Sequence, residues 1–220
     1  MYLSYAMFCE GNSDRDFLGI LVPRVIETLI MSEGQISVDV AAQPIEIPYT
    51  SRRVEDVAKA ACNAREAFYL FFVHADTGGR ALDAALQNRS GAYCEEMRRL
   101  CAWPCDRCVV IAPRRETEAW VMLDHAAVAE ALGFNGSLAN HGMPRNAQEC
   151  ERLEDPKAQL DSVIRSVTGR RRRGSAIDLF PAIAGRLSID VLRTAQSFTT
   201  FENRLRLALQ SLGCLPLRAR

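Results

Sequence analysis

Residues 7–14 read Met7-Phe8-Cys9-Glu10-Gly11-Asn12-Ser13-Asp14 and mark the change from a buried strand to a helix. Apolar and aromatic residues precede Glu10, which predicts a strand over 2–9. Asn12 or Ser13 can cap a helix whose apolar positions continue to Leu29. Glu10 therefore lies at the carboxyl end of the first strand, where open α/β sheets bind ligands. The alternative is that the acids only decorate a loop and a first helical turn, where the helix dipole favours them.

Three further segments predict strands. Residues 35–40 alternate polar with apolar side chains, with 44–48 as an irregular edge extension, and 67–73 form the most apolar run, which predicts the central strand. The last strand is expected over 108–112. Asp76 follows the central strand, and Glu116 and Glu118 open a helix after the last one. Because the carboxyl ends of parallel strands share one edge of a sheet, we expect Glu10 and these three acids to converge there.

Strands and helices alternate through the first part of the chain, with helices expected from Ser51 and over 90–101. This order predicts an α/β fold over 1–132, with a mostly parallel, Rossmann-like sheet flanked by helices. Residues 133–156 are rich in Gly, Asn and Pro and are expected to form an irregular loop that lines or covers the site. Residues 157–220 are expected to form an α-helical C-terminal extension, with helices over 157–168, 176–194 and 198–212.

The composition is that of a globular chain with an uneven distribution of charge. The 220 residues have a net charge of zero, but residues 161–220 hold eleven Arg and four acids and carry +7, which leaves −7 on 1–160. No run is apolar enough for a membrane span and the start lacks a signal peptide, so a cytoplasmic protein without membrane contact is expected. Missing G-x-x-x-x-G-K-[ST] and G-x-G-x-x-G motifs argue against an intrinsic ATPase or a dinucleotide enzyme.

The eight cysteines are expected to be reduced, because they lie in apolar segments of a chain without an export signal. Cys94, Cys101, Cys105 and Cys108 end in a C-x3-C-x2-C spacing. This group is either a set of buried structural thiols or a thiolate zinc site. An iron–sulfur cluster is the third alternative.

Several carboxylates at one sheet edge raise each other's pKa unless a cation neutralises them. A hard divalent ion such as Mg²⁺ or Mn²⁺, held by carboxylates and by substrate phosphate, is the usual solution in phosphoryl transfer. We therefore assign Glu10, Asp76 and one of Glu116 or Glu118 as metal ligands or general bases. Asp14 is expected to be more peripheral.

Short motifs in the chain resemble the TOPRIM domains of OLD-type nucleases, and most closely the small stand-alone prokaryotic TOPRIM-like proteins of unassigned activity. The motifs are Glu10-Gly11-x-Ser13-Asp14, the acid at the end of the central strand and Glu116-x-Glu118-x-Trp120. Asp155-Pro156-Lys157 and Ser197-Phe198-x-x-Phe201 extend the resemblance more loosely. The resemblance implies a metal-dependent nuclease, with metal-site roles on Glu10, Asp14, Asp76, Glu116 and Glu118.

His74 is a departure from that family, because His74-Ala75-Asp76 stands where the family has Asp-x-Asp. Imidazole is a poor ligand for Mg²⁺ and an acceptable one for Mn²⁺ and other transition ions. His74 is thus a metal ligand that selects a softer ion, a proton shuttle, a sign of lost catalysis, or a structural histidine without a chemical role.

Basic residues supply the expected contacts to nucleic acid. These are Arg114, Arg115, Lys157, Arg170, Arg171, Arg172 and Arg173, although an exposed lysine and a solvated arginine run are the plainer interpretations. The predicted function is a metal-dependent phosphodiesterase or nuclease acting on DNA or RNA. The alternative is a catalytically silent TOPRIM-like subunit that binds nucleic acid or a partner in a prokaryotic phage-defence system. A separately encoded ATPase and a homodimer are the expected protein partners.

Overall fold

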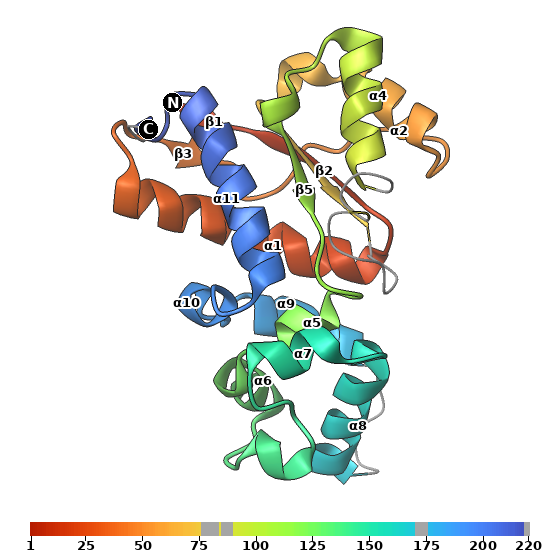
Figure 1. Cartoon of the computed structure of the whole chain (residues 1–220), viewed down its shortest axis with the longest axis vertical. Coiled ribbons are helices and arrows are strands. Elements are labelled where there is room, and N and C mark those ends of the chain that lie inside the picture. Colours follow the sequence, from red (N-terminus) through yellow and green to blue (C-terminus); the bar gives the residue numbers. More distant parts are fainter. Residues whose placement is uncertain (76–83, 85–89, 170–175, 218–220) are drawn as a thin grey trace.

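The chain has an α/β fold in which short parallel strands are flanked by helices (Figure 1). The computed structural model describes residues 1–75, 84, 90–169 and 176–217. None of the helices within these ranges is both long and apolar enough to cross a membrane.

The central sheet has three parallel strands in the order β2-β4-β5, formed by Tyr5–Cys9, Leu70–His74 and Cys108–Ile111. All residues of these strands are buried, and β4 lies in the middle as its apolar run predicts. The register aligns Cys9 with His74 and His74 with Ile111. The carboxyl ends of the three strands therefore end level with one another.

The predicted second strand is much shorter than residues 35–40. Only β3, Asp39–Val40, pairs, and it does so in parallel with β1, Tyr2–Leu3, while Ile45 adds a single bridge to Ala6. Pro44 and Pro48 flank that bridge, and proline has no N–H to donate to a ladder. The edge segment therefore follows the sheet without extending it.

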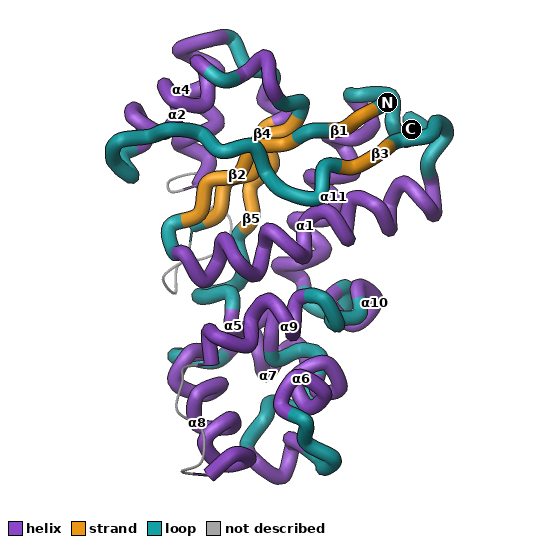
Figure 2. The backbone as a smooth tube through the Cα atoms, turned by 180° about the vertical axis from the view of Figure 1, so that it is seen from behind, coloured by secondary structure: helices purple, strands orange, loops and turns teal. Residues whose placement is uncertain are grey.

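Alternate strand residues face two separate cores. Tyr5, Met7 and Phe72 belong to one apolar cluster, whereas Phe8 and Phe71 belong to the other. Figures 1 and 2 show α1, Asn12–Glu33, and α11, Gln196–Ser211, on the first face, with α2, Val54–Asn63, and α4, Gly91–Cys101, on the second. Strand alternation thus produces a helix–sheet–helix sandwich. Two 3-10 turns, η1 (Arg65–Ala67) and η3 (Cys105–Arg107), precede β4 and β5.

The remaining helices form a second group below the sheet in Figure 1. They are α5 (Glu118–Val121), α6 (His125–Leu132), η4 (Leu138–His141), α7 (Ala147–Arg152), α8 (Pro156–Thr168), η6 (Ala176–Leu179), α9 (Phe180–Ala184) and α10 (Ile189–Leu192). The expected loop over 133–156 is wrong in part, because η4 and α7 lie within it. The helix expected over 176–194 is three short helices, and the helix expected from Ser51 begins at Val54.

Aromatic side chains join this helical group to the sheet. Trp120 of α5 is fully buried, donates its indole N–H to Ser197 Oγ at 2.8 Å, and packs on Phe198 and Phe201 of α11 with centroid distances of 5.2 and 5.9 Å. Phe201 also meets Phe72 of β4 at 6.4 Å. The C-terminal helix is therefore part of the main core.

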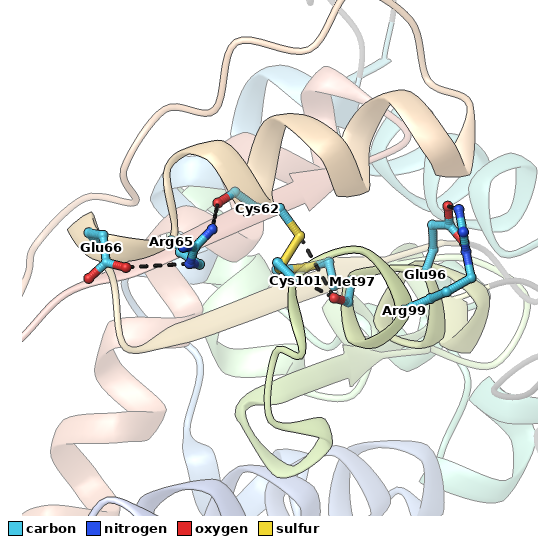
Figure 3. The surroundings of a disulfide bond; sticks show 7 residues. All are labelled: Cys62, Arg65, Glu66, Glu96, Met97, Arg99 and Cys101. Carbon is cyan, nitrogen blue, oxygen red and sulfur yellow. Dashed lines mark hydrogen bonds and ion pairs between the residues drawn. A yellow bond between two sulfur atoms is a disulfide. The ribbon is translucent and has the colours of Figure 1, made fainter.

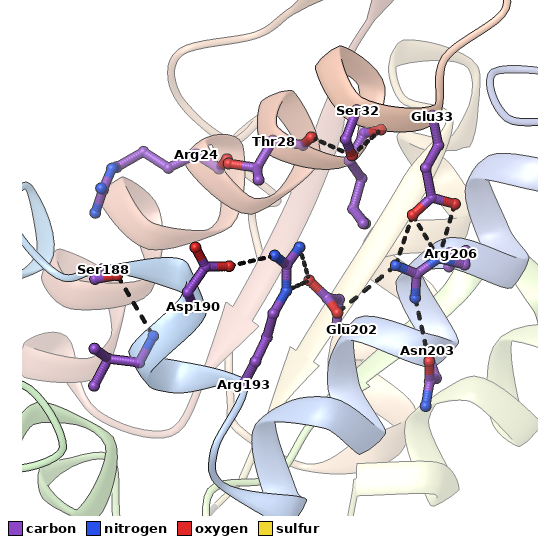
Figure 4. Close-up of polar contacts among 12 residues, drawn as sticks. Arg24, Thr28, Ser32, Glu33, Ser188, Asp190, Arg193, Glu202, Asn203 and Arg206 are labelled. Atoms are coloured by element: carbon purple, nitrogen blue, oxygen red, sulfur yellow. Dashed lines mark hydrogen bonds and ion pairs between the residues drawn. The ribbon is translucent and has the colours of Figure 1, made fainter.

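Charged side chains also join α11 to α1 and α10 (Figure 4). Glu202, 5% exposed, accepts hydrogen bonds from Arg193 Nε at 2.8 Å, and its second oxygen lies 3.8 Å from Arg206 Nη2. Arg206 in turn donates to Glu33 of α1 at 2.9 Å. A largely buried carboxylate needs such partners, so this network fixes how α11 lies on α1.

Four cysteines form disulfides, which corrects the expectation of reduced thiols. Cys62–Cys101 joins α2 to α4 (Figure 3). Cys94–Cys108 joins α4 to β5. Three of the four residues proposed for a zinc site are therefore in disulfides, while Cys105 is an exposed free thiol. Sequence spacing suggested a single cluster, but the partner of Cys101 comes from a distant helix.

Candidate functional site

The predicted acids of two separate segments line one cavity of about 270 Å³ at the carboxyl ends of β2 and β5. Its lining consists of Glu10, Gly11, Ser13, Asp14, Glu116, Glu118 and Lys157. The structure thus brings together four of the five acids that were predicted as site residues. Asp76, the fifth, lies outside the described residues, as do Arg170 to Arg173.

The first side of the cavity is the turn between β2 and α1. Gly11 precedes the helix, and a Cβ atom at this position would lie 2.5 Å from Asp14 Oδ2. Any larger residue would displace that carboxylate, which explains the glycine in the Glu10-Gly11 pair. The turn therefore places the Asp14 carboxylate close to the backbone of Gly11.

Two buried side chains, those of Thr117 and His74, lie next to the Asp14 carboxylate. Thr117, fully buried, donates its hydroxyl hydrogen bond to Asp14 Oδ1 at 2.7 Å. His74, also fully buried at the end of β4, has Nε2 3.3 Å from Thr117 Oγ1 and Nδ1 3.9 Å from Asp14 Oδ2. His74 does not line the cavity. The structure therefore places His74 next to Thr117 and Asp14 in the buried layer, away from the cavity lining.

The second side comes from the segment after β5. Arg115 has a positive φ of 68°, and its Nη1 donates to the carbonyl of Glu154 at 3.0 Å. This bend carries Glu116 toward α8, where its Oε2 accepts the backbone N–H of Lys157 at 3.1 Å. Arg114 is exposed and does not line the cavity. The two arginines predicted together therefore differ: Arg115 anchors the backbone and Arg114 faces solvent.

Glu118, the first residue of α5, is only 7% exposed. Burial raises the pKa of its carboxyl to about 7, and the Glu116 and Asp14 carboxylates act in the same direction, against the opposing effect of Lys157. A carboxyl of this pKa exchanges its proton near neutral pH.

Lys157 supplies the cavity's positive charge. It follows Pro156 in the first turn of α8, whose N-cap is Asp155 with a side-chain bond to the N–H of Ala158 at 2.7 Å. The capped helix start fixes the direction in which Lys157 projects. The Asp155-Pro156-Lys157 motif of the sequence is thus the capped start of α8, and it places the Lys157 ammonium beside the acids.

The donor set suits a hard divalent cation, because its members are carboxylates from segments remote in sequence. Within residues 1–75, 90–169 and 176–217, however, no three His, Cys, Asp or Glu side chains lie close enough together to form a ready metal cage. Asp14 and Glu116 already accept hydrogen bonds from Thr117 and the Lys157 amide. Glu10 and Glu118 line the same cavity.

Sequence reasoning missed Thr117. It stands between two acids in Glu116-Thr117-Glu118, and its type gives no sign that its hydroxyl bonds a residue 103 positions away.

Comparisons with family models, curated proteins and solved structures found no match to this chain.

Proposed function

We propose that the chain is a divalent-metal-dependent phosphodiesterase that acts on nucleic acid, with a TOPRIM-like arrangement of its acids. The observation that carries the proposal is the single cavity lined by Glu10, Asp14, Glu116, Glu118 and Lys157 at the carboxyl ends of parallel strands. Carboxylates and one cation around such a cavity match what metal-assisted attack on a phosphodiester needs.

Mg²⁺ or Mn²⁺ would be held by Glu10 and Glu118, with Asp14 and Asp76 as further ligands, and when bound it would neutralise phosphate charge and lower the pKa of water. The Lys157 ammonium binds a phosphoryl oxygen as a point charge. A carboxylate oxygen of the cavity that is not bound to the cation would take up the proton of the attacking water. His74 and Thr117 keep Asp14 in place.

The test is cleavage of labelled DNA and RNA in Mg²⁺ and then in Mn²⁺. Glu10→Gln and Glu118→Gln should each lower the rate at least about 100-fold, because each removes a charge used at the reacting centre. Glu66→Gln is the matched control, since the Glu66 side chain is 90% exposed and lies outside the cavity lining. Cleavage that is equal in all four proteins would refute the proposal and point to a contaminating nuclease.

One observation favours a second candidate, a catalytically silent subunit that binds nucleic acid or a partner. Asp14 and Glu116 are already engaged by protein donors. This candidate predicts nucleic-acid binding without metal-dependent cleavage. A separately encoded ATPase, a homodimer and a cytoplasmic location complete the proposal. The two disulfides argue against that location, since reducing compartments rarely preserve them, so finding both cysteine pairs reduced in the purified chain would support it.

A further inference from the structure

A second cavity, of about 470 Å³, lies among the helices below the sheet, between the η4–α7 segment and α8. Met143, Pro144 and Leu153 form its apolar lining, and Arg145 and Arg152 stand at its rim. Neither arginine was singled out by the sequence, because each is isolated in a segment without periodicity.

Hydrogen bonds fix the walls of this cavity. Gln159 of α8 donates its side-chain N–H to the carbonyl of Gly142 at 2.6 Å. Asn146 caps α7 by accepting the N–H of Glu149 at 3.0 Å, and Glu149 Oε2 accepts the backbone N–H of Arg145 at 2.8 Å. The one acid in the lining is therefore occupied by the protein's own donors, and the segment is held in shape before a ligand arrives.

The guanidinium groups of Arg145 and Arg152 are available for a ligand. Both residues are exposed, and in the described ranges neither side chain makes an ion pair or hydrogen bond, whereas Arg186 and Arg193 each pair with a carboxylate. Two unpaired guanidinium groups above an apolar surface suit a ligand with an anionic part and a flat apolar part. A nucleotide, with its phosphate and base, has this chemistry.

The two cavities lie on different faces of the first turns of α8. Lys157 lines the acidic cavity and Gln159 lines the second one. Residues two apart on a helix do not share a face, so a helix of about 10 to 12 Å diameter separates the cavities. A flexible polynucleotide that crosses the start of α8 can reach both.

We infer that the second cavity binds a nucleotide flanking the scissile phosphate of a single-stranded nucleic acid, with Arg145 and Arg152 on its phosphates. An unpaired strand can place a base on the apolar lining, whereas a duplex keeps its bases stacked inside. The inference rests on the proposed function, because it assumes that the acidic cavity holds a phosphodiester.

The test measures affinity for the same fluorescent single-stranded oligonucleotide as DNA and as RNA, in EDTA so that no cleavage occurs, over about 50 to 200 mM salt. The Arg145→Gln/Arg152→Gln variant should bind at least about tenfold more weakly, and its log–log salt slope should fall by about 1.4, or about 0.7 per lost contact. Arg204→Gln is the control, since Arg204 is exposed on α11 and lies outside the lining of both cavities.

The outcomes separate this inference from the proposed function. If the wild-type chain cleaves nucleic acid in Mg²⁺ or Mn²⁺ while the double variant matches Arg204→Gln in affinity and slope, the inference is overturned and the proposed function stands. If the wild-type chain neither binds nor cleaves either strand, both fail. Should the double variant not fold, Arg152→Lys replaces it. This variant should bind more weakly with an unchanged salt slope, because lysine keeps the charge and loses only the bidentate geometry of the guanidinium group. An unchanged affinity would overturn the inference.

Discussion

Replacing Glu118 with glutamine should stabilise the chain, and the gain should depend on pH. Burial raises the pKa of Glu118 from 4.5 to about 7, so the folded chain holds this proton more tightly than the unfolded chain does. Between these two values the wild-type protein therefore loses stability as pH rises, by about 1.4 kcal/mol per pH unit. The amide of Glu118→Gln does not titrate. Its advantage should be near zero at pH 4.5 and reach about 3 kcal/mol above pH 7.

The assay is urea unfolding in EDTA at pH 5 and pH 8, which reports the free energy of unfolding without any bound cation. Glu66→Gln, at an exposed position, should stay within about 1 kcal/mol of the wild-type protein at both pH values. An advantage of Glu118→Gln that is the same at pH 5 and pH 8, or smaller at pH 8, would refute the claim that burial and neighbouring acids disfavour the Glu118 carboxylate. If Glu118→Gln is more stable than the wild-type protein but no longer cleaves nucleic acid, the carboxylate of Glu118 lowers stability and is needed for function.

Three further predictions concern contacts around the site and the core. Thr117→Val should lower the free energy of unfolding by about 1 to 3 kcal/mol, because Asp14 loses a buried donor, and Thr117→Ser should recover most of it in the same urea assay. Glu202→Gln should cost about 2 to 3 kcal/mol by thermal or urea unfolding, since Arg193 and Arg206 both lose a largely buried carboxylate and Arg193 keeps only the exposed Asp190. Glu130→Gln in an exposed pair should cost under about 1 kcal/mol. Mass spectrometry of the denatured chain should find four alkylated cysteines before reduction and eight after it, and reduction should destabilise the fold by about 3 to 4 kcal/mol per disulfide; eight alkylated cysteines before reduction would contradict both disulfides.

The sheet and the convergence of acids could be predicted because each depends on a local pattern. The short, uninterrupted apolar and aromatic run before His74 is typical of a strand buried on both faces, and it is β4, the central strand. Glu10 and Glu116 each follow a parallel strand, and the aligned strand ends bring them to one cavity. Topology rather than any single residue made this inference possible.

Other features depended on distant contacts that a sequence does not display. The sequence shows a histidine at position 74 but not whether its side chain lines a cavity or lies in the core. Only the packing of the folded chain shows that His74 is buried. The partner of Cys101 is 39 residues away on another helix, and pairing cannot be read from spacing alone. Helix α7 has six residues, too few for an apolar period to stand out from the loop around it.

Calorimetric titration of the metal-free chain with Mn²⁺ and Mg²⁺ tests the central claim most directly. We expect saturable binding that is at least about tenfold weaker in Glu10→Gln and in Glu118→Gln and unchanged in Glu66→Gln. At pH 6.5 the wild-type protein should also release a proton on binding, seen as heat that varies with the buffer, because Glu118 must ionise to bind the cation. No saturable binding, or binding that neither cavity variant weakens, would contradict the claim that these acids share a divalent cation.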